Sequence, residues 1–371
     1  MAEIEAIVMP KWGLAMQEGM VASWLVEEGE EIEKGEEIAD IETSKIANAF
    51  ESPVEGLLRR LVAGEGETLP VGALLAVVAP EEVGDATIDA FVADFQARFA
   101  AEGSSAAVAP EPQTVEAGGR RLRYLELGDA AGTPVLLVHG FGGDLNNWLF
   151  NQEELAEDYR TLAIDLPGHG GSAKEVGDGD VGTLAAAVLA FMDARGIERA
   201  HLVGHSLGGA ICIDLALNHP GRVASLTALA PAGLGPEIDI AFIDGFIASN
   251  RARKLRPFLE MLVHDPALVT AEMVEDVLRF KRLDGVEAAL NSIAQACFSG
   301  GRQSLQFEAR LEELRCPAQV IWGKQDRILP ASHAEDLPET LEAHLFEDAG
   351  HLIHMERARE VNALIGAMLR R

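Results

Sequence analysis

The sequence predicts two folded parts, a small all-β barrel or sandwich followed by an α/β domain with a helical cap. Three observations support this fold class. Residues 1–79 contain an internal repeat, residues from about 114 onward alternate between short apolar runs and helical stretches, and this alternation stops between about 235 and 310. Short runs separated by glycine turns are typical of paired β-strands, whereas alternating strands and helices indicate a mostly parallel sheet.

The N-terminal repeat has a period of 37 residues and predicts two similar halves with pseudo-twofold symmetry. Lys45 lies in the segment that joins the halves, in the sequence DIETSKI. It is either a solvated surface lysine, as most lysines are, or a point of chemical attachment at an exposed turn. The residues that recur at this interval are Gly19 and Gly56, Gly29 and Gly66, Gly35 and Gly72, and Ile38 and Leu75.

Residues 80–113 differ in character from both flanking parts. Apolar side chains at positions 88, 91, 92, 95 and 99 follow the spacing of one helix face, which predicts an amphipathic helix. The helix is expected to pack on a neighbouring domain or subunit and could serve in assembly. The following stretch AAEGSSAAVAPEPQ is rich in alanine, serine and proline without periodicity, which indicates a flexible linker.

A G-x-S-x-G pattern in the α/β part, Gly204-His205-Ser206-Leu207-Gly208, follows an apolar strand and precedes a helix. In such a tight strand-to-helix turn the serine hydroxyl is exposed at the top of the sheet, where it can act as a nucleophile. A serine before a helix can also be a simple N-cap, so the pattern needs partners elsewhere in the chain.

Candidate partners follow in the expected order. Asp326 lies just after the apolar run AQVIWG, and His351 follows Gly350 near the C-terminus. A serine hydroxyl needs a base, and the base needs a carboxylate to fix its tautomer, so Ser206, Asp326 and His351 are the candidate catalytic residues. The loop after PVLLVHG would bring the Phe141 amide beside the Leu207 amide, and together they would form an oxyanion hole.

Several other polar residues near these motifs favour structural interpretations. His139 and His354 are interpreted as hydrogen-bonding residues and His205 as a packing or pocket residue. Asp165 and His169 are expected to hold the loop AIDLPGHGGS, and Trp148 is either an acyl-pocket residue or a buried anchor.

Charge and cysteine content restrict the possible partners. The chain has 30 basic and 60 acidic residues, a net charge of −30, and residues 1–79 hold 16 acidic and 5 basic side chains. Such a field argues against nucleic acid and anionic membranes. Three scattered cysteines predict neither a disulfide framework nor a metal site. With no apparent signal peptide or membrane span, a cytoplasmic location is expected.

The motifs together resemble two known families. Residues 114–371 resemble the α/β-hydrolase superfamily, with the cap at approximately 235–310. Residues 1–79 resemble the lipoyl domain of 2-oxoacid dehydrogenase acyltransferases, a lipoyl/biotinyl-type barrel, through MPKWGLAM (9–16), the segment from Val26 to Lys45, and ESPVEGLL (51–58). In that family the lysine at the hairpin tip carries lipoyl in amide linkage, and Lys45 occupies this place. Methionines usually flank the lysine of biotin carriers, so lipoyl is favoured here.

The combination resembles the acyltransferase (E2) component of acetoin dehydrogenase systems over the whole chain. This resemblance implies acetyl transfer from lipoyl-lysine to coenzyme A, within a complex that contains a thiamine-diphosphate-dependent E1 and a dihydrolipoyl dehydrogenase, E3. A homo-oligomer is expected. The His-x-x-x-Asp-Gly signature of ordinary E2 catalytic domains is absent from the sequence. Two alternatives remain: a hydrolase of small esters, thioesters or carbon–carbon bonds with an appended carrier, and a carrier or assembly subunit whose hydrolase domain is inert.

Overall fold

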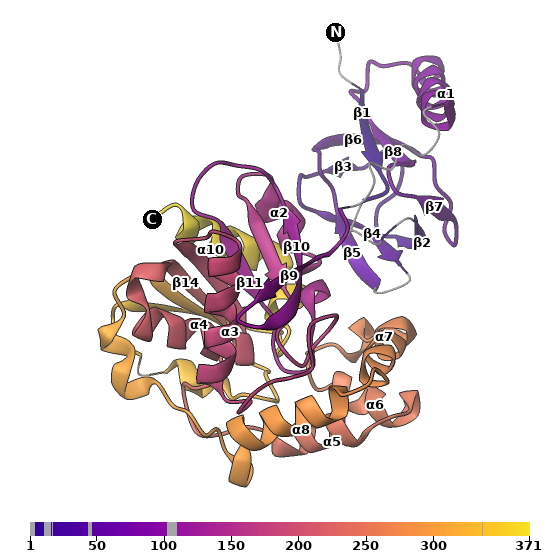
Figure 1. Cartoon of the computed structure of the whole chain (residues 1–371). Coiled ribbons are helices and arrows are strands. Elements are labelled where there is room, and N and C mark those ends of the chain that lie inside the picture. Colours follow the sequence, from indigo (N-terminus) through magenta and orange to yellow (C-terminus); the bar gives the residue numbers. More distant parts are fainter. Residues whose placement is uncertain (1–3, 11–15, 17, 44–46, 102–109, 336) are drawn as a thin grey trace. The chain divides into compact units, whose positions relative to one another are not determined.

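A computed structural model describes residues 4–10, 16, 18–43, 47–101, 110–335 and 337–371. The chain divides into two compact units, Met1–Ala109 and Pro110–Arg371, which are described separately (Figure 1). The predicted arrangement, an all-β unit followed by an α/β unit with a mostly parallel sheet, is confirmed.

The N-terminal unit contains two four-stranded antiparallel sheets whose orders are β1-β8-β6-β3 and β5-β4-β2-β7. Under the 37-residue offset, β6, β7 and β8 repeat β2, β3 and β4, so the two sheets have equivalent orders. The strand bounds are β1 (Glu5–Val8), β2 (Glu18–Trp24), β3 (Glu31–Ile32), β4 (Glu37–Glu42), β5 (Ala47–Glu51), β6 (Gly56–Leu61), β7 (Thr68–Pro70) and β8 (Leu74–Val78).

Helix α1 (Asp85–Ala101) belongs to this N-terminal unit. Ile88 is completely buried and forms a cluster with Leu74 and Val77 of β8. Ion pairs from Arg59 and Arg60 of β6 to Asp85 and Asp89 join the same surfaces. The helix was expected to pack on a neighbouring domain or subunit, and it packs on apolar residues of the sheet formed by residues 1–79, the first of these two alternatives.

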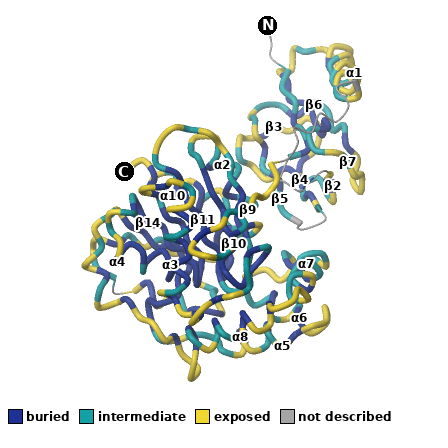
Figure 2. Tube along the Cα trace, viewed as in Figure 1, coloured by how far each residue is buried: buried dark blue, intermediate teal, exposed yellow. Residues whose placement is uncertain are grey.

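The second unit is built on an eight-stranded sheet of order β16-β15-β14-β13-β11-β12-β10-β9. The pairs from β16 to β12 are parallel, and the two strands at the other edge pair antiparallel. Strands β11 and β14 lie in the buried centre of the unit (Figure 2). The bounds are β9 (Gln113–Ala117), β10 (Arg120–Leu127), β11 (Val135–Val138), β12 (Thr161–Ile164), β13 (Ala200–His205), β14 (Val223–Leu229), β15 (Ala318–Gly323) and β16 (Leu341–Phe346).

Helices cover this sheet in two groups. In one group, α4 packs against β13 and β14, while α3 packs on α4 and β9. In the other, α2 contacts β10 and β12, and α10 contacts β14 and β15. No helix in the described part of the chain is long and apolar enough to cross a bilayer. The bounds are α2 (Gln152–Ala156), α3 (Val181–Ala194), α4 (Leu207–Asn218), α9 (Ile353–Glu356) and α10 (Ala358–Leu369), with the 3₁₀ helices η1 (Leu145–Trp148), η2 (Pro220–Arg222), η5 (Glu308–Glu313) and η6 (Ala331–Ala334).

Between β14 and β15 the chain forms a helical layer beside one end of the sheet (Figure 1). Phe246 and Leu290 contribute to its buried apolar side, which is continuous with the main core. This layer corresponds to the predicted cap. Its helices are α5 (Ile240–Ala248), α6 (Ala252–Leu259), α7 (Ala271–Lys281) and α8 (Val286–Cys297), with the 3₁₀ helices η3 (Pro266–Leu268) and η4 (Ser299–Gly301).

Candidate active site

Ser206 occupies the sharp turn between β13 and α4. Its backbone has φ 54° and ψ −117°, a strained conformation for a residue with a side chain. The turn is possible because its neighbours are glycines: a methyl group at Gly204 would lie 2.4 Å from the Gly208 carbonyl oxygen, and one at Gly208 would lie 2.1 Å from the Val138 carbonyl oxygen. The side chain is only slightly exposed, at the end of the strand where a nucleophile would be placed.

Asp326 and His351 form a buried pair. His351 Nδ1 donates a hydrogen bond of 2.7 Å to Asp326 Oδ2, and both side chains are almost completely shielded from solvent. Asp326 Oδ1 accepts from the backbone N–H groups of Ile328 and Leu329 at 2.8 and 3.0 Å. This arrangement fixes the tautomer of His351 with its Nε2 atom available as an acceptor, which a general base requires.

His205 links the loop of the candidate base to the strand that carries the candidate nucleophile. His205 Nε2 lies 2.9 Å from the His351 carbonyl oxygen, so it carries the proton and donates, and the two ring centroids are 4.6 Å apart. Among the described residues, no hydrogen bond joins the Ser206 hydroxyl to His351. Such bonds are often long before a substrate binds, so the geometry leaves both residues as candidates.

The loop after β11 presents an amide that is free to bind an oxyanion. The Gly140 carbonyl oxygen accepts from His139 Nδ1 at 2.7 Å and from the Gly143 N–H at 3.2 Å. Because the C=O and N–H groups of a trans peptide point in opposite directions, these bonds turn the Phe141 N–H away from His139. A methyl group at Gly140 would lie 3.0 Å from Ser206 Cβ, so the loop rests against the candidate nucleophile.

Phe141 and Leu207 have the amides expected of an oxyanion hole. In the described part of the chain, neither N–H group donates to a protein acceptor. Leu207 begins α4, whose first amides point toward Ser206 because a helix leaves its initial N–H groups unpaired.

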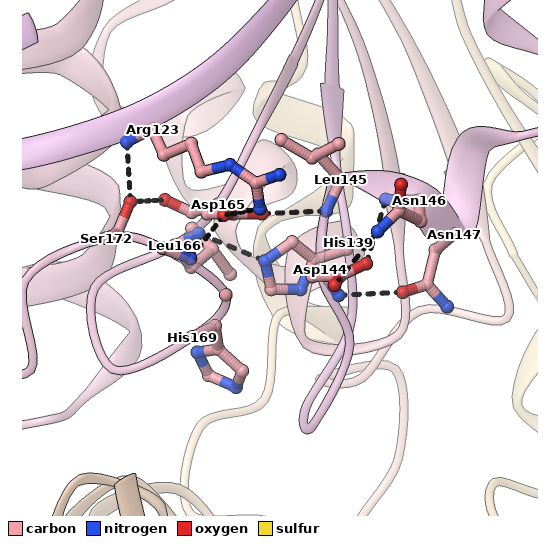
Figure 3. A network of polar contacts seen from close by, with 12 residues as sticks. Arg123, His139, Asp144, Leu145, Asn146, Asn147, Asp165, Leu166, His169 and Ser172 are labelled. Atoms are coloured by element: carbon pink, nitrogen blue, oxygen red, sulfur yellow. Dashed lines mark hydrogen bonds and ion pairs between the residues drawn. The ribbon is translucent and has the colours of Figure 1, made fainter. Parts of the chain in front are cut away.

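Two histidines hold the loop after β11, residues 139–144, which is called the oxyanion loop below. Each does so in one particular tautomer. His139 Nε2 accepts from the Leu166 N–H at 3.0 Å (Figure 3). His169 Nε2 accepts from the Gly142 N–H at 3.0 Å, while its Nδ1 donates to the Pro167 carbonyl oxygen at 3.1 Å. Each imidazole must be neutral for this, because a protonated ring nitrogen cannot accept a hydrogen bond. Both histidines therefore have the structural roles inferred from the sequence.

Asp165 holds the same loop in place through hydrogen bonds that Figure 3 shows. Its side chain is completely buried and accepts from the Leu145 N–H at 2.8 Å, from the Gly171 N–H at 2.7 Å and from Arg123 at 3.1 Å. Asp144 caps η1 by accepting from the Asn146 N–H. Thus Asp165 joins the loops after β11 and β12, and the interpretation that it holds a loop fits these contacts.

Aromatic residues of the cap rest on the oxyanion loop. The Phe141 ring packs at 6.1 Å from Phe246 and 6.0 Å from Phe298. A methyl group at Gly142 would lie 2.5 Å from the Phe246 ring, and Phe280 stacks on His169. The cap therefore contributes apolar surface directly beside the candidate oxyanion hole.

Four buried imidazoles make the second unit sensitive to acid. Burial, the largest cause in each case, lowers the pKa of His139, His169 and His205, and it lowers the pKa of His354 to about 3. In the unfolded chain these histidines have a pKa of about 6.5, so below that pH they bind protons that they do not bind in the folded protein. Stability therefore falls as the pH drops below about 6.5. Burial also raises the pKa of Asp144 to about 6, which opposes this loss at lower pH.

We expect the urea midpoint of the second unit to fall between pH 7.5 and pH 6. Once the pH is below 6.5, the free energy of unfolding should decrease by about 1 kcal/mol per histidine and pH unit. Fluorescence of the buried Trp148 and Trp322 would follow this transition. His354→Met removes one titrating group and should reduce the pH dependence. A midpoint that stays constant over this range would contradict the neutral assignment of these histidines.

Lys45, the predicted attachment point, lies outside the described residues. Its neighbouring strands are described: β4 and β5 pair antiparallel, and Glu42 lies opposite Ala47. Residues 43–46 therefore connect two adjacent strands of one sheet, and Lys45 is the lysine within that connection.

Trp322 is a residue near the site that sequence reasoning missed. It lies in β15, is completely buried, and donates from Nε1 to Asp326 Oδ2 at 2.9 Å. The available signal was a tryptophan four positions before the candidate aspartate, because a buried indole N–H usually needs an acceptor. The cap residue Phe246 was also missed, since apolar periodicity does not show which ring reaches the loop.

Comparisons with known proteins agree with both parts of this description. Residues 133–358 match the family model described as alpha/beta hydrolase fold, and residues 5–78 match the model described as biotin-requiring enzyme. A meta-cleavage product hydrolase from Pseudomonas fluorescens shares the fold of the second unit, with a TM-score of 0.64 and 24% identity over 70% of this chain and 97% of that one. The fold and the site thus define a lipoyl/biotinyl-type carrier domain joined to an α/β-hydrolase-fold domain.

Two full-length relatives define the family more narrowly. The chain is 50% identical to the dihydrolipoyllysine-residue acetyltransferase component of the acetoin cleaving system of Pseudomonas putida, over 100% of both chains. It is 48% identical to the component of the same name from Cupriavidus necator, over 97% of this chain and 96% of that one. The chain belongs to the family of dihydrolipoyllysine-residue acetyltransferase components of acetoin cleaving systems.

Proposed function

We propose that the chain transfers an acetyl group from a lipoyl arm on Lys45 to coenzyme A, and that Ser206, His351 and Asp326 perform the transfer. The observation that carries this proposal is the buried 2.7 Å bond from His351 to Asp326 beside the strained Ser206 turn. The carrier domain fused to the same chain supplies a reason for acyl chemistry at that turn.

The N-terminal unit fits a covalently attached arm. Strands β4 and β5 form one antiparallel pair, and the connection between them contains Lys45. When attached there, a lipoyl group would supply a thiol that carries acetyl as a thioester. An arm on a rigid sheet raises the effective concentration of its cargo at each site it can reach.

The first half of the transfer acylates the serine. His351 Nε2 would take the Ser206 proton as the hydroxyl oxygen attacks the acetyl carbonyl carbon, and Asp326 would stabilise the imidazolium. The amides of Phe141 and Leu207 would bind the oxyanion. Collapse breaks the carbon–sulfur bond, and the departing sulfur receives the proton from His351, which leaves acetyl on Ser206 and a free thiol.

The second half reverses these roles with another thiol. His351 would remove the proton from coenzyme A, whose sulfur attacks the acetyl carbonyl carbon. As the carbon–oxygen bond breaks, the Ser206 oxygen recovers the proton from His351. Transfer must be faster than hydrolysis, so water has to be kept from the acetyl group, and the cap residues Phe246 and Phe298 beside Phe141 provide apolar cover for this.

The partners follow from the proposed role within the system. We propose that a thiamine-diphosphate-dependent enzyme acetylates the arm and that a dihydrolipoyl dehydrogenase reoxidises it. The high acidity of residues 1–79, 16 acidic against 5 basic side chains, would give these enzymes a surface to recognise. A cytoplasmic homo-oligomer fits this role.

Product analysis separates transfer from hydrolysis. The full-length chain, lipoylated and acetylated on its arm, would be incubated with and without coenzyme A. We expect acetyl-coenzyme A to form at least about tenfold faster than acetate, a preference of roughly 1.4 kcal/mol for the thiol. Acetate at an equal rate in both samples would favour the hydrolase alternative. Normal turnover of a complex containing Ser206→Ala would favour the inert carrier.

A further inference from the structure

The carboxylate of Asp326 receives four hydrogen bonds, two at each oxygen. Oδ1 accepts two backbone N–H groups, whereas Oδ2 accepts His351 Nδ1 at 2.7 Å and Trp322 Nε1 at 2.9 Å. Two side chains donate to this carboxylate among the described residues: the candidate base His351 and the indole of Trp322. The indole is completely buried, and the same Nε1–H is shared with the Leu329 carbonyl oxygen at 3.1 Å.

We propose that Trp322 is a positioning residue for the Ser206 site: its indole N–H holds Asp326 Oδ2 in line with His351 and limits how strongly that oxygen attracts the imidazole proton. This inference rests on the proposed function, because it assigns His351 as the base. Among the described residues no hydrogen bond or ring contact joins Trp322 to Ser206, so Trp322 would act through Asp326.

The physical reason lies in how a carboxylate oxygen shares its lone pairs. With the indole N–H on one lone pair of Oδ2, the other points at His351 Nδ1 and the carboxylate cannot rotate freely. Without the indole, Oδ2 has one donor, carries more negative charge toward His351, and stabilises the imidazolium more strongly. The proton affinity of His351 then rises, and the base is protonated at a higher pH.

The other titratable groups described around His351 do not take over the role of the Asp326 carboxylate in setting the proton affinity of His351. His205, at the end of β13, and His354, in α9, are kept neutral because burial lowers the pKa of each. Glu356, also in α9, accepts from the Gly350 and His264 backbone N–H groups, and burial raises its pKa. Asp326 is the carboxylate that directly contacts the base.

Trp148 provides a matched control. It is also completely buried, and its Nε1 atom has no hydrogen-bond partner within the described residues. Its ring packs 4.9 Å from His354, so it too lies in the core near the site. Replacing either tryptophan removes the same atoms, but only one replacement removes a donor to Asp326.

The test is the pH profile of acetyl-serine formation, measured as the burst with an activated acetate ester on the full-length chain. Trp322→Phe is expected to move the acid limb upward by about half a pH unit to one unit and to slow the burst about tenfold, consistent with loss of a hydrogen bond to a charged group. Trp148→Phe should leave the acid limb in place. An unmoved limb in Trp322→Phe, or an equal shift in both variants, overturns the assignment.

A second replacement preserves shape where phenylalanine leaves a cavity. Benzothienylalanine introduced at position 322 substitutes sulfur for the indole N–H and should give the same shift in a protein of near-normal stability, and the same change at position 148 should not. A wild-type burst no faster than that of Ser206→Ala would overturn the proposed function itself. A Ser206-dependent burst with an unmoved limb would overturn only the role of Trp322.

Discussion

Replacing Ser206 with alanine is expected to reduce acetyl transfer to coenzyme A by at least about 1,000-fold, because the variant keeps the oxyanion hole and substrate binding but loses the nucleophile. Little loss of stability is expected, since the hydroxyl makes no hydrogen bond to another described residue and alanine fits the space that serine leaves. The measurement is the rate of acetyl-coenzyme A formation from the acetylated arm, with the unfolding midpoint as a check of integrity.

Ser225→Ala is the matched control for this variant. Ser225 is also buried and lies in the neighbouring strand β14, where it contacts His201 Nδ1 at 2.7 Å. Its replacement should preserve the transfer rate at moderate pH. If Ser206→Ala transferred acetyl at the rate of Ser225→Ala, direct attack by coenzyme A on the arm would be the better mechanism.

Replacing Lys45 with arginine is expected to abolish transfer that starts from the chain's own arm. Arginine retains the positive charge but offers no amine that can form the amide bond. The variant should nevertheless transfer acetyl from free acetyl-dihydrolipoamide at nearly the wild-type rate, because the second unit is unchanged. Three quantities are measured: the intact mass of the variant after lipoylation, the rate of transfer from its own arm, and the rate of transfer from free acetyl-dihydrolipoamide.

Lys34→Arg serves as the control for charge and location. Lys34 is an exposed lysine of the same acidic unit, at a turn between β3 and β4. Lipoylation and transfer should be normal in this variant. A lipoyl group found on Lys45→Arg, or equal loss of activity in both variants, would show that attachment occurs elsewhere or that the arm is not required.

Much of the fold could be predicted because it depends on periodic features of the sequence. The 37-residue repeat of Gly19 and Gly56 predicted two similar halves, and the equivalent strand orders of the two sheets agree with that. The alternation after residue 114 anticipated the parallel sheet. The partner of α1 could not be predicted, because an amphipathic face such as that of Ile88 shows that something covers it but not which surface does.

The candidate site was predictable where it depends on short motifs. Ser206 was found from the glycines that its turn requires, and Asp326 and His351 from their order after apolar strands. The contacts that tune them were not predictable. Whether Trp322 Nε1 points at Asp326, or His169 Nε2 at the Gly142 amide, depends on ring orientations and tautomers that only the folded chain determines.

Passage of the acetyl group through Ser206 can be tested by locating that group during a single turnover. The acetylated full-length chain would be held without coenzyme A, quenched and digested, and the acetyl group assigned by mass to a peptide. We expect acetyl on the peptide containing Ser206, and we expect it to disappear as acetyl-coenzyme A forms once coenzyme A is added. Acetyl that stays on the Lys45 peptide until coenzyme A is added, and never appears on Ser206, would contradict passage through Ser206.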